Sequence, residues 1–318
     1  MSQPRDDPGA VPALGGERRR RRMAVLGGSA LKPDPSDRPG LRSLAGTILD
    51  IAPGLLLLRD RDGRELRLET SSATTVWHGG RAGLEALKPG CEAFVRPTAD
   101  GLGADRIWMD IVRVTGTIVT IGKEIVEVDG GPHRGRSHVV IPARSFGRVL
   151  VRHPRFEPGF LLDVIGTRTP DGPLAVQPGT YQPAYRADQV PAPGIVGGAV
   201  PRTLRGTATW FGQAGRGAAY PALDSEGQSG GCPDAPAGCA RLPLLSHGSD
   251  LLVRNECTAR YATVPVTECG CMAARYCDRC VECGTSPRGR LVELTAESFV
   301  DLGGDLDAGC FNVALTPR

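Results

Sequence analysis

Ten cysteines are the side chains of this 318-residue chain best suited to chemistry, and nine of them fall in its C-terminal part. The nine are Cys232, Cys239, Cys257, Cys269, Cys271, Cys277, Cys280, Cys283 and Cys310, while Cys91 stands apart. Cysteines at this density form either a disulfide framework or a metal site. Disulfides need only an oxidising compartment and neighbouring Cα atoms about 5.5 Å apart. We expect bridges here, with one thiol left over or paired with Cys91 because nine is odd.

Two kinds of metal site are the alternatives to disulfides. The first is a tetrahedral zinc site, whose four ligands would be Cys271, Cys277, Cys280 and Cys283. The second is an iron–sulfur cluster on the Cys-x-x-Cys-x-x-Cys run, although the Cys-Pro pair that follows in ferredoxins is absent after Cys283. Cys232 and Cys239 bracket a loop containing proline and glycine, which a single bridge would close. We therefore favour disulfides and expect no metal or cofactor.

Four segments around these cysteines follow one another in an order that is typical of one family. They are Gly206-Thr-Ala-Thr-Trp-Phe-Gly212, His247-Gly-Ser-Asp-Leu-Leu-Val-Arg-Asn255, Ala262-Thr-Val-Pro-Val-Thr-Glu-Cys-Gly270 and Arg290-Leu-Val-Glu-Leu-Thr-Ala-Glu-Ser-Phe299. Together they resemble the rare-lipoprotein-A (RlpA) family and the related expansins. The resemblance implies a six-stranded double-psi β-barrel over residues 204–318. It also implies that the domain binds peptidoglycan or a related cell-wall polysaccharide, and it leaves open whether the domain also cleaves it as a lytic transglycosylase.

The resemblance also points to site residues. Glu268 stands where the family has the aspartate of Asp-Arg-Gly, and Glu293 stands where it has the aspartate of Asp-Leu-Ser. Cleavage of a glycosidic bond needs a carboxylic acid that protonates the leaving oxygen, so these two glutamates are the candidate catalytic residues. The candidate substrate-binding residues are Thr209, Trp210, Phe211 and His247.

The chain departs from the family pattern at two positions. Cys269 replaces the arginine of Asp-Arg-Gly, and Leu242 stands where many relatives have a histidine. These departures keep a non-catalytic wall-binding or structural module open as the alternative to an enzyme. The resemblance further implies a bridge between Cys257 and Cys269, which end two strands that are adjacent in this fold.

Local signals predict one helix within this region. Thr295 is a suitable N-cap, Glu297 falls in the first turn, and Gly303-Gly304 would end the helix.

An internal repeat precedes the cysteine-rich region. Gly46-Thr-Ile-Leu-Asp-Ile51 is echoed by Gly116-Thr-Ile-Val-Thr-Ile121, and Lys88-Pro-Gly90 is echoed by Glu157-Pro-Gly159. Apolar and polar residues alternate between glycine-containing turns, which indicates short antiparallel strands. We predict two small OB-like β-barrels, at residues 43–113 and 114–183, that act as a spacer or scaffold. Trp77 and Trp108 are expected to fill the core of the first.

The remaining segments are not expected to form domains. Residues 1–42 contain the five arginines 18–22 and then a short apolar stretch, so they are either a disordered basic tail or a twin-arginine export signal. Residues 184–203 are a linker rich in proline and glycine. No apolar run approaches the roughly 20 residues that span a bilayer, and basic stripes interleaved with aromatic residues are absent, so we expect no nucleic-acid partner.

The sequence therefore predicts an all-β, modular protein that is secreted or associated with the cell envelope and binds a wall glycan. A cytoplasmic zinc-binding protein is the remaining alternative, and it would require reduced thiols.

Overall fold

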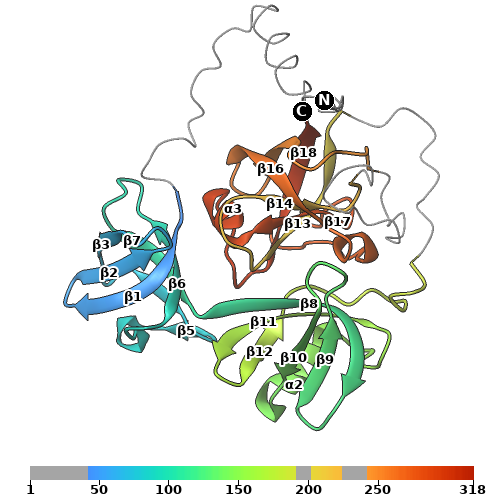
Figure 1. Ribbon diagram of the computed structural model, residues 1–318, viewed down its shortest axis with the longest axis horizontal. Helices are drawn as coiled ribbons and strands as arrows, with labels where there is room; N and C mark the ends of the chain where they lie inside the picture. The colour runs from blue at the N-terminus through green and yellow to red at the C-terminus, as the bar shows by residue number, and fades with distance from the viewer. Residues whose placement is uncertain (1–41, 191–201, 224–241) are drawn as a thin grey trace, which may run out of the picture. The chain divides into compact units, whose positions relative to one another are not determined.

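The computed structural model describes residues 42–190, 202–223 and 242–318. The predicted export signal, most of the predicted linker, and Cys232 and Cys239 lie outside these residues. Within them the protein is mostly β, with one open sheet and two closed barrels (Figure 1). This confirms the predicted all-β class. Among the described residues, no helix has the length and apolarity needed to span a membrane.

The first sheet has seven strands in the order β3-β2-β1-β6-β7-β4-β5. Its strands are β1 (Leu44–Ala52), β2 (Leu55–Asp60), β3 (Glu65–Glu69), β4 (Thr75–Trp77), β5 (Arg81–Ala82), β6 (Glu92–Pro97) and β7 (Ala104–Met109), with the short helix η3 (Leu84–Ala86) before β6. We predicted a small barrel here, and the sheet is open instead. The reason is that β4 pairs in parallel with β7 and occupies its free edge, so that β3 reaches this side only through one bridge between Glu69 and Gly103.

The second sheet is a closed five-stranded barrel in the order β10-β12-β11-β8-β9. Its elements are β8 (Ile111–Ile121), β9 (Ile125–Asp129), β10 (Arg136–Val140), α2 (Ala143–Arg152), β11 (Leu161–Thr169) and β12 (Gly172–Pro178). The repeat seen in the sequence is visible in the pairing, because β2-β1-β6-β7 follows the same order as β9-β8-β11-β12. Gly46 and Gly116 play the same part in the two copies: a Cβ atom at either position would collide with a carbonyl of the neighbouring strand, at Arg59 or Asp129.

The third sheet is a closed six-stranded barrel in the order β13-β17-β14-β16-β15-β18. Its elements are β13 (Leu204–Phe211), β14 (Ala218–Tyr220), β15 (Asp250–Asn255), β16 (Tyr261–Cys269), η4 (Ala273–Arg275), β17 (Arg290–Thr295), α3 (Ala296–Asp301) and β18 (Cys310–Pro317). Two strand pairs are parallel, β13 with β17 and β14 with β16. The predicted helix is confirmed as α3, and the Thr295 side chain accepts a hydrogen bond from the backbone N–H of Ser298 as its cap.

The core of the third barrel extends into the rest of the protein. Val253, Val292 and Leu294 belong to a buried cluster that also includes Trp77 and Trp108 of the first sheet. Both tryptophans are buried as predicted, but they do not fill a core of the first sheet alone, whose own cluster is separate. The first sheet and the third barrel therefore bury apolar surface against each other.

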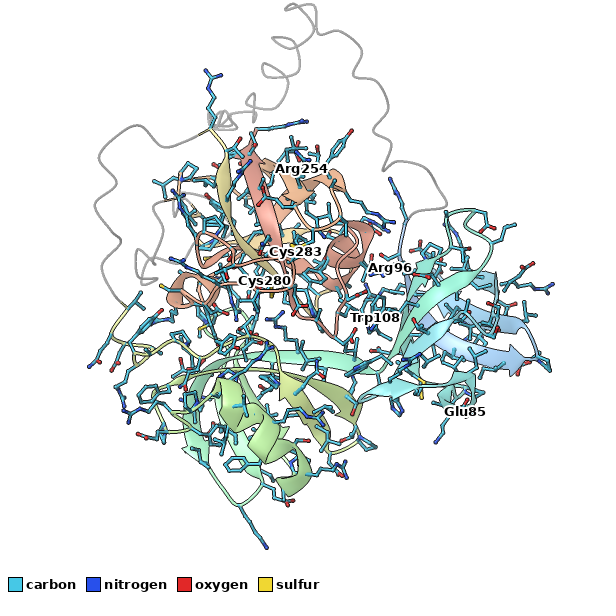
Figure 2. All side chains as sticks on the ribbon, turned by 180° about the vertical axis from the view of Figure 1, so that it is seen from behind. Glu85, Arg96, Trp108, Arg254, Cys280 and Cys283 are labelled. Atoms are coloured by element: carbon cyan, nitrogen blue, oxygen red, sulfur yellow. A yellow bond between two sulfur atoms is a disulfide. The ribbon has the colours of Figure 1, made fainter. Side chains whose placement is uncertain are left out.

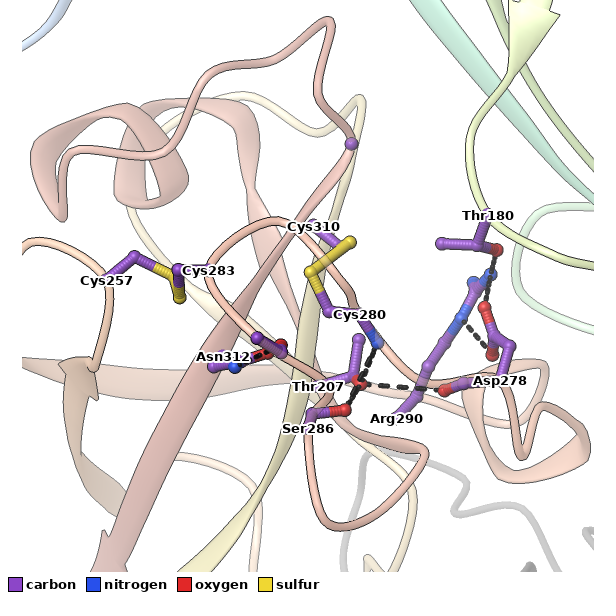
Figure 3. Close-up of a disulfide and its surroundings, with 12 residues drawn as sticks. Thr180, Thr207, Cys257, Asp278, Cys280, Cys283, Ser286, Arg290, Cys310 and Asn312 are labelled. Carbon is purple, nitrogen blue, oxygen red and sulfur yellow. Dashed lines mark hydrogen bonds and ion pairs between the residues drawn. A yellow bond between two sulfur atoms is a disulfide. The ribbon is translucent and has the colours of Figure 1, made fainter.

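Two disulfides hold the long loop between β16 and β17. Cys257 is bonded to Cys283, with Cα atoms 5.6 Å apart, and Cys280 to Cys310, with Cα atoms 5.9 Å apart (Figure 3). The expected bridge between Cys257 and Cys269 is wrong, because the turn after β15 presents Cys257 to the loop rather than to the end of β16. The zinc site of four cysteines is also wrong, since Cys280 and Cys283 are already bonded elsewhere.

The other cysteines of the described residues fall into two groups. Cys269, Cys271 and Cys277 are also disulfide-bonded. Among the described residues, Cys91 is the cysteine that forms no disulfide. The unpaired thiol that we expected is therefore outside the described part of the cysteine-rich region.

Candidate functional site

The register of the third barrel brings the two predicted carboxylates to one face. On the short strand β14, Ala219 pairs with Glu268 of β16 on one side and with Glu293 of β17 on the other. Residues that pair across neighbouring strands point to the same side of a sheet. The side chains of Glu268 and Glu293 therefore stand on one face, with strand β14 between them. Thr209 of β13 pairs with Glu293 and extends the row.

An arginine from the second barrel joins the two carboxylates. The Nε atom of Arg134 lies 3.0 Å from Oε1 of Glu268, and its Nη1 atom lies 2.8 Å from Oε2 of Glu293. The guanidinium carbon also lies 4.4 Å from the centre of the Phe211 ring. Its Nη2 atom is buried without a hydrogen-bond partner among the described residues. One side chain thus links both candidate acids with a candidate substrate-binding residue.

A tight turn between β9 and β10 positions Arg134. The backbone N–H of Gly135 donates to the carbonyl of Gly131 at 2.8 Å, and the N–H of Gly130 donates to the carbonyl of Gly135 at 2.7 Å. Gly131 has a φ of 87° and Gly135 has a φ of 64°, a region that glycine adopts without a Cβ clash. The carboxylate of Asp129 accepts the N–H of Gly131 and fixes the start of the turn.

Behind the acid pair lies a fully buried network of charged side chains. Arg290 contacts Asp278 at 3.2 Å (Figure 3). It also contacts Glu293 at 3.2 Å and donates to Asp163 of the second barrel. Arg113 forms two hydrogen bonds with the same Asp163 carboxylate, at 2.8 and 2.6 Å. Buried charges at this density are tolerated only when each is paired and hydrogen-bonded.

The network sets the ionisation of its carboxylates. Burial alone would raise the pKa of Glu293, but Arg134 and Arg290 together lower it below its usual value. The pKa of Asp163 follows the same balance: burial raises it, and Arg113 and Arg290 bring it well below normal. Both groups are ionised at neutral pH. In this geometry Glu293 has no proton to give to a leaving oxygen.

A cavity of about 640 Å³ opens next to Arg134. All three sheets contribute to its wall, which includes Arg61 and Phe94 from the first, Arg113, His133 and Arg134 from the second, and Trp210, Phe211 and Glu268 from the third. The wall combines charged side chains with two aromatic rings of the third barrel that are themselves almost fully buried, so the charged side chains are its means of binding a polar ligand.

The other predicted residues differ in how they relate to this cavity. Trp210 is buried, and its indole N–H donates to the carbonyl of Leu306 at 2.8 Å, although the side chain still borders the cavity. Thr209 is buried beside Glu293, and its hydroxyl has no hydrogen-bond partner within the described ranges. His247 is exposed and contacts the carbonyl of Thr267 through Nε2 at 3.0 Å. It is not part of the cavity wall, so the structure does not bring it to the acid pair.

Sequence reasoning missed the arginines of the site. Arg290 opens one of the four family-like segments, and its position three residues before Glu293 was an available signal. Arg134 carried no such signal, because its only distinction in sequence is a glycine-rich turn in another repeat unit.

Comparison with known protein families and with characterised proteins finds no match for this chain.

Proposed function

We propose that this is an exported cell-wall protein that binds peptidoglycan or a related polysaccharide at the cavity bordered by Arg134 and Glu268. The observation that carries the proposal is the junction of Arg134, Glu268, Glu293 and Phe211 beside a cavity of about 640 Å³. Cavities of about 300–1,000 Å³ accommodate small ligands, so the space suits a short stretch of a sugar chain.

Strand order supports the family resemblance. Six strands with two crossing parallel pairs, β13 with β17 and β14 with β16, are the arrangement expected of a double-psi β-barrel. The second barrel, with a helix between its third and fourth strands and its third strand beside its fifth, supports an OB-like identity. We infer that the first sheet is a second, incompletely closed copy of the same unit.

The disulfides support export. Bridges persist in oxidising compartments and are rare in the cytosol. Cys257–Cys283 and Cys280–Cys310 therefore favour the cell envelope over the cytoplasmic zinc-binding alternative.

The chemistry of the cavity favours binding over lysis. A lytic mechanism needs a carboxylic acid that is protonated when the sugar arrives. Glu293 is ionised and buried, and Glu268 is held by the guanidinium of Arg134. The carboxylate of Glu268, which borders the cavity, can accept hydrogen bonds from sugar hydroxyls. The lytic alternative requires Glu268 to separate from Arg134 and reach the leaving oxygen.

Sedimentation with purified sacculi tests the proposal. The full chain is expected to pellet with peptidoglycan sacculi without releasing 1,6-anhydro muropeptides. Glu268→Gln removes the charge that Arg134 holds, and its affinity is expected to fall about tenfold, the cost of losing a charged hydrogen bond. Glu282→Gln is the matched control, because this glutamate is exposed on the loop before β17, outside the cavity wall.

Three results would decide against the proposal as stated. If the chain does not pellet with sacculi, the function is wrong. If Glu268→Gln pellets as well as the wild type, the site is wrong. Release of anhydro muropeptides by the wild type that is lost in Glu268→Gln would establish the lytic alternative instead.

A further inference from the structure

Helix α2 of the second barrel carries an outward face of unusual composition. Ser145 and Val149 face the barrel and are buried, whereas Arg144, Arg148 and Val151 are exposed. The helix has no acidic residue. Among the described residues, neither exposed arginine has a carboxylate partner in an ion pair.

These arginines do not stabilise the helix that carries them. Arg144, Arg148 and Arg152 are spaced four residues apart, and like charges at that spacing destabilise a helix by a few tenths of a kcal/mol each. Arg144 also lies in the first turn, where the positive end of the helix dipole disfavours a cation. Their placement therefore needs a reason outside the helix.

Exposed apolar side chains lie beside the cationic ones. Val151 is 76% exposed and Ile125 is 51% exposed. Ile125 stands next to the start of α2, because it pairs with Val140 and because the N–H of Ile141 donates to the carbonyl of Glu124. The surface formed by α2 and the β8–β9 turn thus combines cations with apolar groups.

Further groups extend this surface at the other end of α2. Arg152 stacks on the ring of Tyr181 at 4.8 Å, and Tyr181 is partly exposed. Phe156, which follows the helix, packs edge-on against Phe146 in the first half of α2. Two exposed carboxylates, those of Glu124 and Glu157, are next in the chain to the Ile125 and Phe156 residues of this surface.

We propose that the α2 surface docks on the face of an anionic lipid bilayer. Cations at such a surface are attracted by acidic headgroups, and neighbouring apolar side chains enter the boundary with the acyl chains. A soluble polyanion would use the arginines but would gain nothing from exposed Val151 and Ile125. This inference does not depend on the proposed glycan site.

The topology places the two surfaces at opposite ends of one hairpin. Strand β10 begins at Arg136, two residues after Arg134, and ends at Val140, three residues before α2 begins. Docking through α2 would therefore leave the Arg134 end of the hairpin and its cavity free for a ligand.

Vesicle sedimentation of the full chain tests the inference. Binding is expected to vesicles of phosphatidylcholine with phosphatidylglycerol and not to vesicles of phosphatidylcholine alone. The variant Arg144→Ala/Arg148→Ala is expected to bind about thirtyfold more weakly, from the typical contribution of two arginines near an anionic surface. Val151→Asp is expected to weaken binding severalfold by opposing entry into the acyl boundary. The control Arg254→Ala/Arg279→Ala, at two exposed arginines of the third barrel, should bind as the wild type does.

Several outcomes would overturn this assignment. Equal binding to neutral vesicles, or unchanged binding by Arg144→Ala/Arg148→Ala, would exclude the surface. Loss of vesicle binding in the arginine variant without any effect of Val151→Asp, together with tight binding of soluble polyphosphate, would identify a polyanion site instead. Sacculus binding by the arginine variant should stay at the wild-type level, which separates this inference from the proposed glycan function.

Discussion

The third barrel meets the rest of the protein at two junctions that are built in opposite ways. Its junction with the second barrel consists of buried charges, in which the side chains of Arg113, Asp163, Arg290 and Glu293 are all fully buried. Its junction with the first sheet combines buried apolar contacts with ion pairs that are partly exposed. Arg96 lies 2.7 Å from Asp305 there, and the two side chains are 17% and 38% exposed.

The junction with the first sheet also contains buried groups, and Trp108 is one of them. The guanidinium group of Arg96 lies 5.1 Å from its ring centre (Figure 2). The guanidinium group of Arg106 lies 5.2 Å from the ring centre, and the indole N–H donates to Asp307 at 2.7 Å. Apolar and cation–π contacts therefore contribute more at this junction than the ion pairs around them.

The difference separates a junction that tolerates change from one that does not. Exposed ion pairs contribute about 0.2–1 kcal/mol each, so the first sheet can lose one and remain in place. Removing one partner of a buried pair leaves an uncompensated charge and costs about 3–5 kcal/mol. The candidate site belongs to the second kind of junction, because Arg134 comes from the second barrel. That barrel is therefore part of the site and more than a spacer.

The largest effect is expected from Asp163→Ala. The change leaves Arg113 and Arg290 buried without their shared carboxylate, and the free energy of unfolding should fall by about 3–5 kcal/mol. Urea titration measures it. Asp171→Ala, at an exposed turn of the same barrel, should change stability by less than about 0.5 kcal/mol. A loss below 1 kcal/mol at Asp163 would remove the contrast between the two junctions, and Asp163→Asn provides a second variant if the alanine protein does not fold.

The next largest effect is expected from removing one disulfide. Cys280 and Cys310 close a separation of 30 residues, and Asp278 of the buried junction lies on the loop that this bridge holds. Cys280→Ser/Cys310→Ser should lower the free energy of unfolding by about 2–4 kcal/mol. Cys91→Ser, at the free thiol of the first sheet, is the control and should have a small effect. Hydrogen exchange on this variant adds a second measurement. Protection of backbone amides should fall in β17 and β11 relative to the wild type, and it should not fall in β6. An equal loss of amide protection in β6 would contradict the difference between the two junctions.

Sequence alone captured features that depend on local pattern. Gly46 and Gly116 occupy the same place in the two sequence repeats, and at both a neighbouring strand lies too close for a Cβ atom. The strand order of the two sheets repeats in the same way. Thr295 caps α3 because a threonine hydroxyl satisfies a free N–H at a helix start. The resemblance of two segments to a known family selected Glu268 and Glu293, and in the structure their shared partner Ala219 brings them to one face.

Features that depend on contacts between distant segments could not be predicted. Arg134 reaches Glu293 across 159 residues of chain, and nothing near it in sequence indicates a carboxylate partner. The bridge of Cys257 with Cys283 depends on the path of a loop that has little regular structure. The first sheet stays open because the short strand β4 occupies the edge of β7, and three residues are too few for alternation to predict their pairing.

Mild acid should act on the buried junction. His153 is buried, its Nε2 donates to the carbonyl of Asp163 at 2.8 Å, and burial lowers its pKa below the usual value. The unfolded chain takes up this proton near the ordinary histidine pKa of about 6.5. The contribution of neutral His153 to stability is therefore present above that pH and is lost as the pH falls below it.

The effect of His153 is measured by urea unfolding midpoints between pH 8 and pH 5, a range that extends about 1.5 units to either side of the ordinary histidine pKa. The midpoint of the wild type should fall with pH, and His153→Gln should show a smaller fall. His138→Gln, at an exposed histidine of β10, should keep the dependence of the wild type. The same fall in His153→Gln as in the wild type would mean that another group is responsible.

The smallest effect is expected at the junction with the first sheet, from Asp305→Ala. The change removes a partner of Arg96 at 2.7 Å and of Arg106 at 3.4 Å, but both arginines keep their positions over Trp108 and Arg106 also keeps Asp307. Since water screens charges that are this exposed, the free energy of unfolding should fall by only about 0.2–1 kcal/mol, and the loss should shrink in high salt. A double-mutant cycle with Arg96→Ala measures the pair itself. A coupling above about 2 kcal/mol that persists in high salt would place this pair in the same class as Arg290 and Asp163, and the two junctions would then not differ in kind.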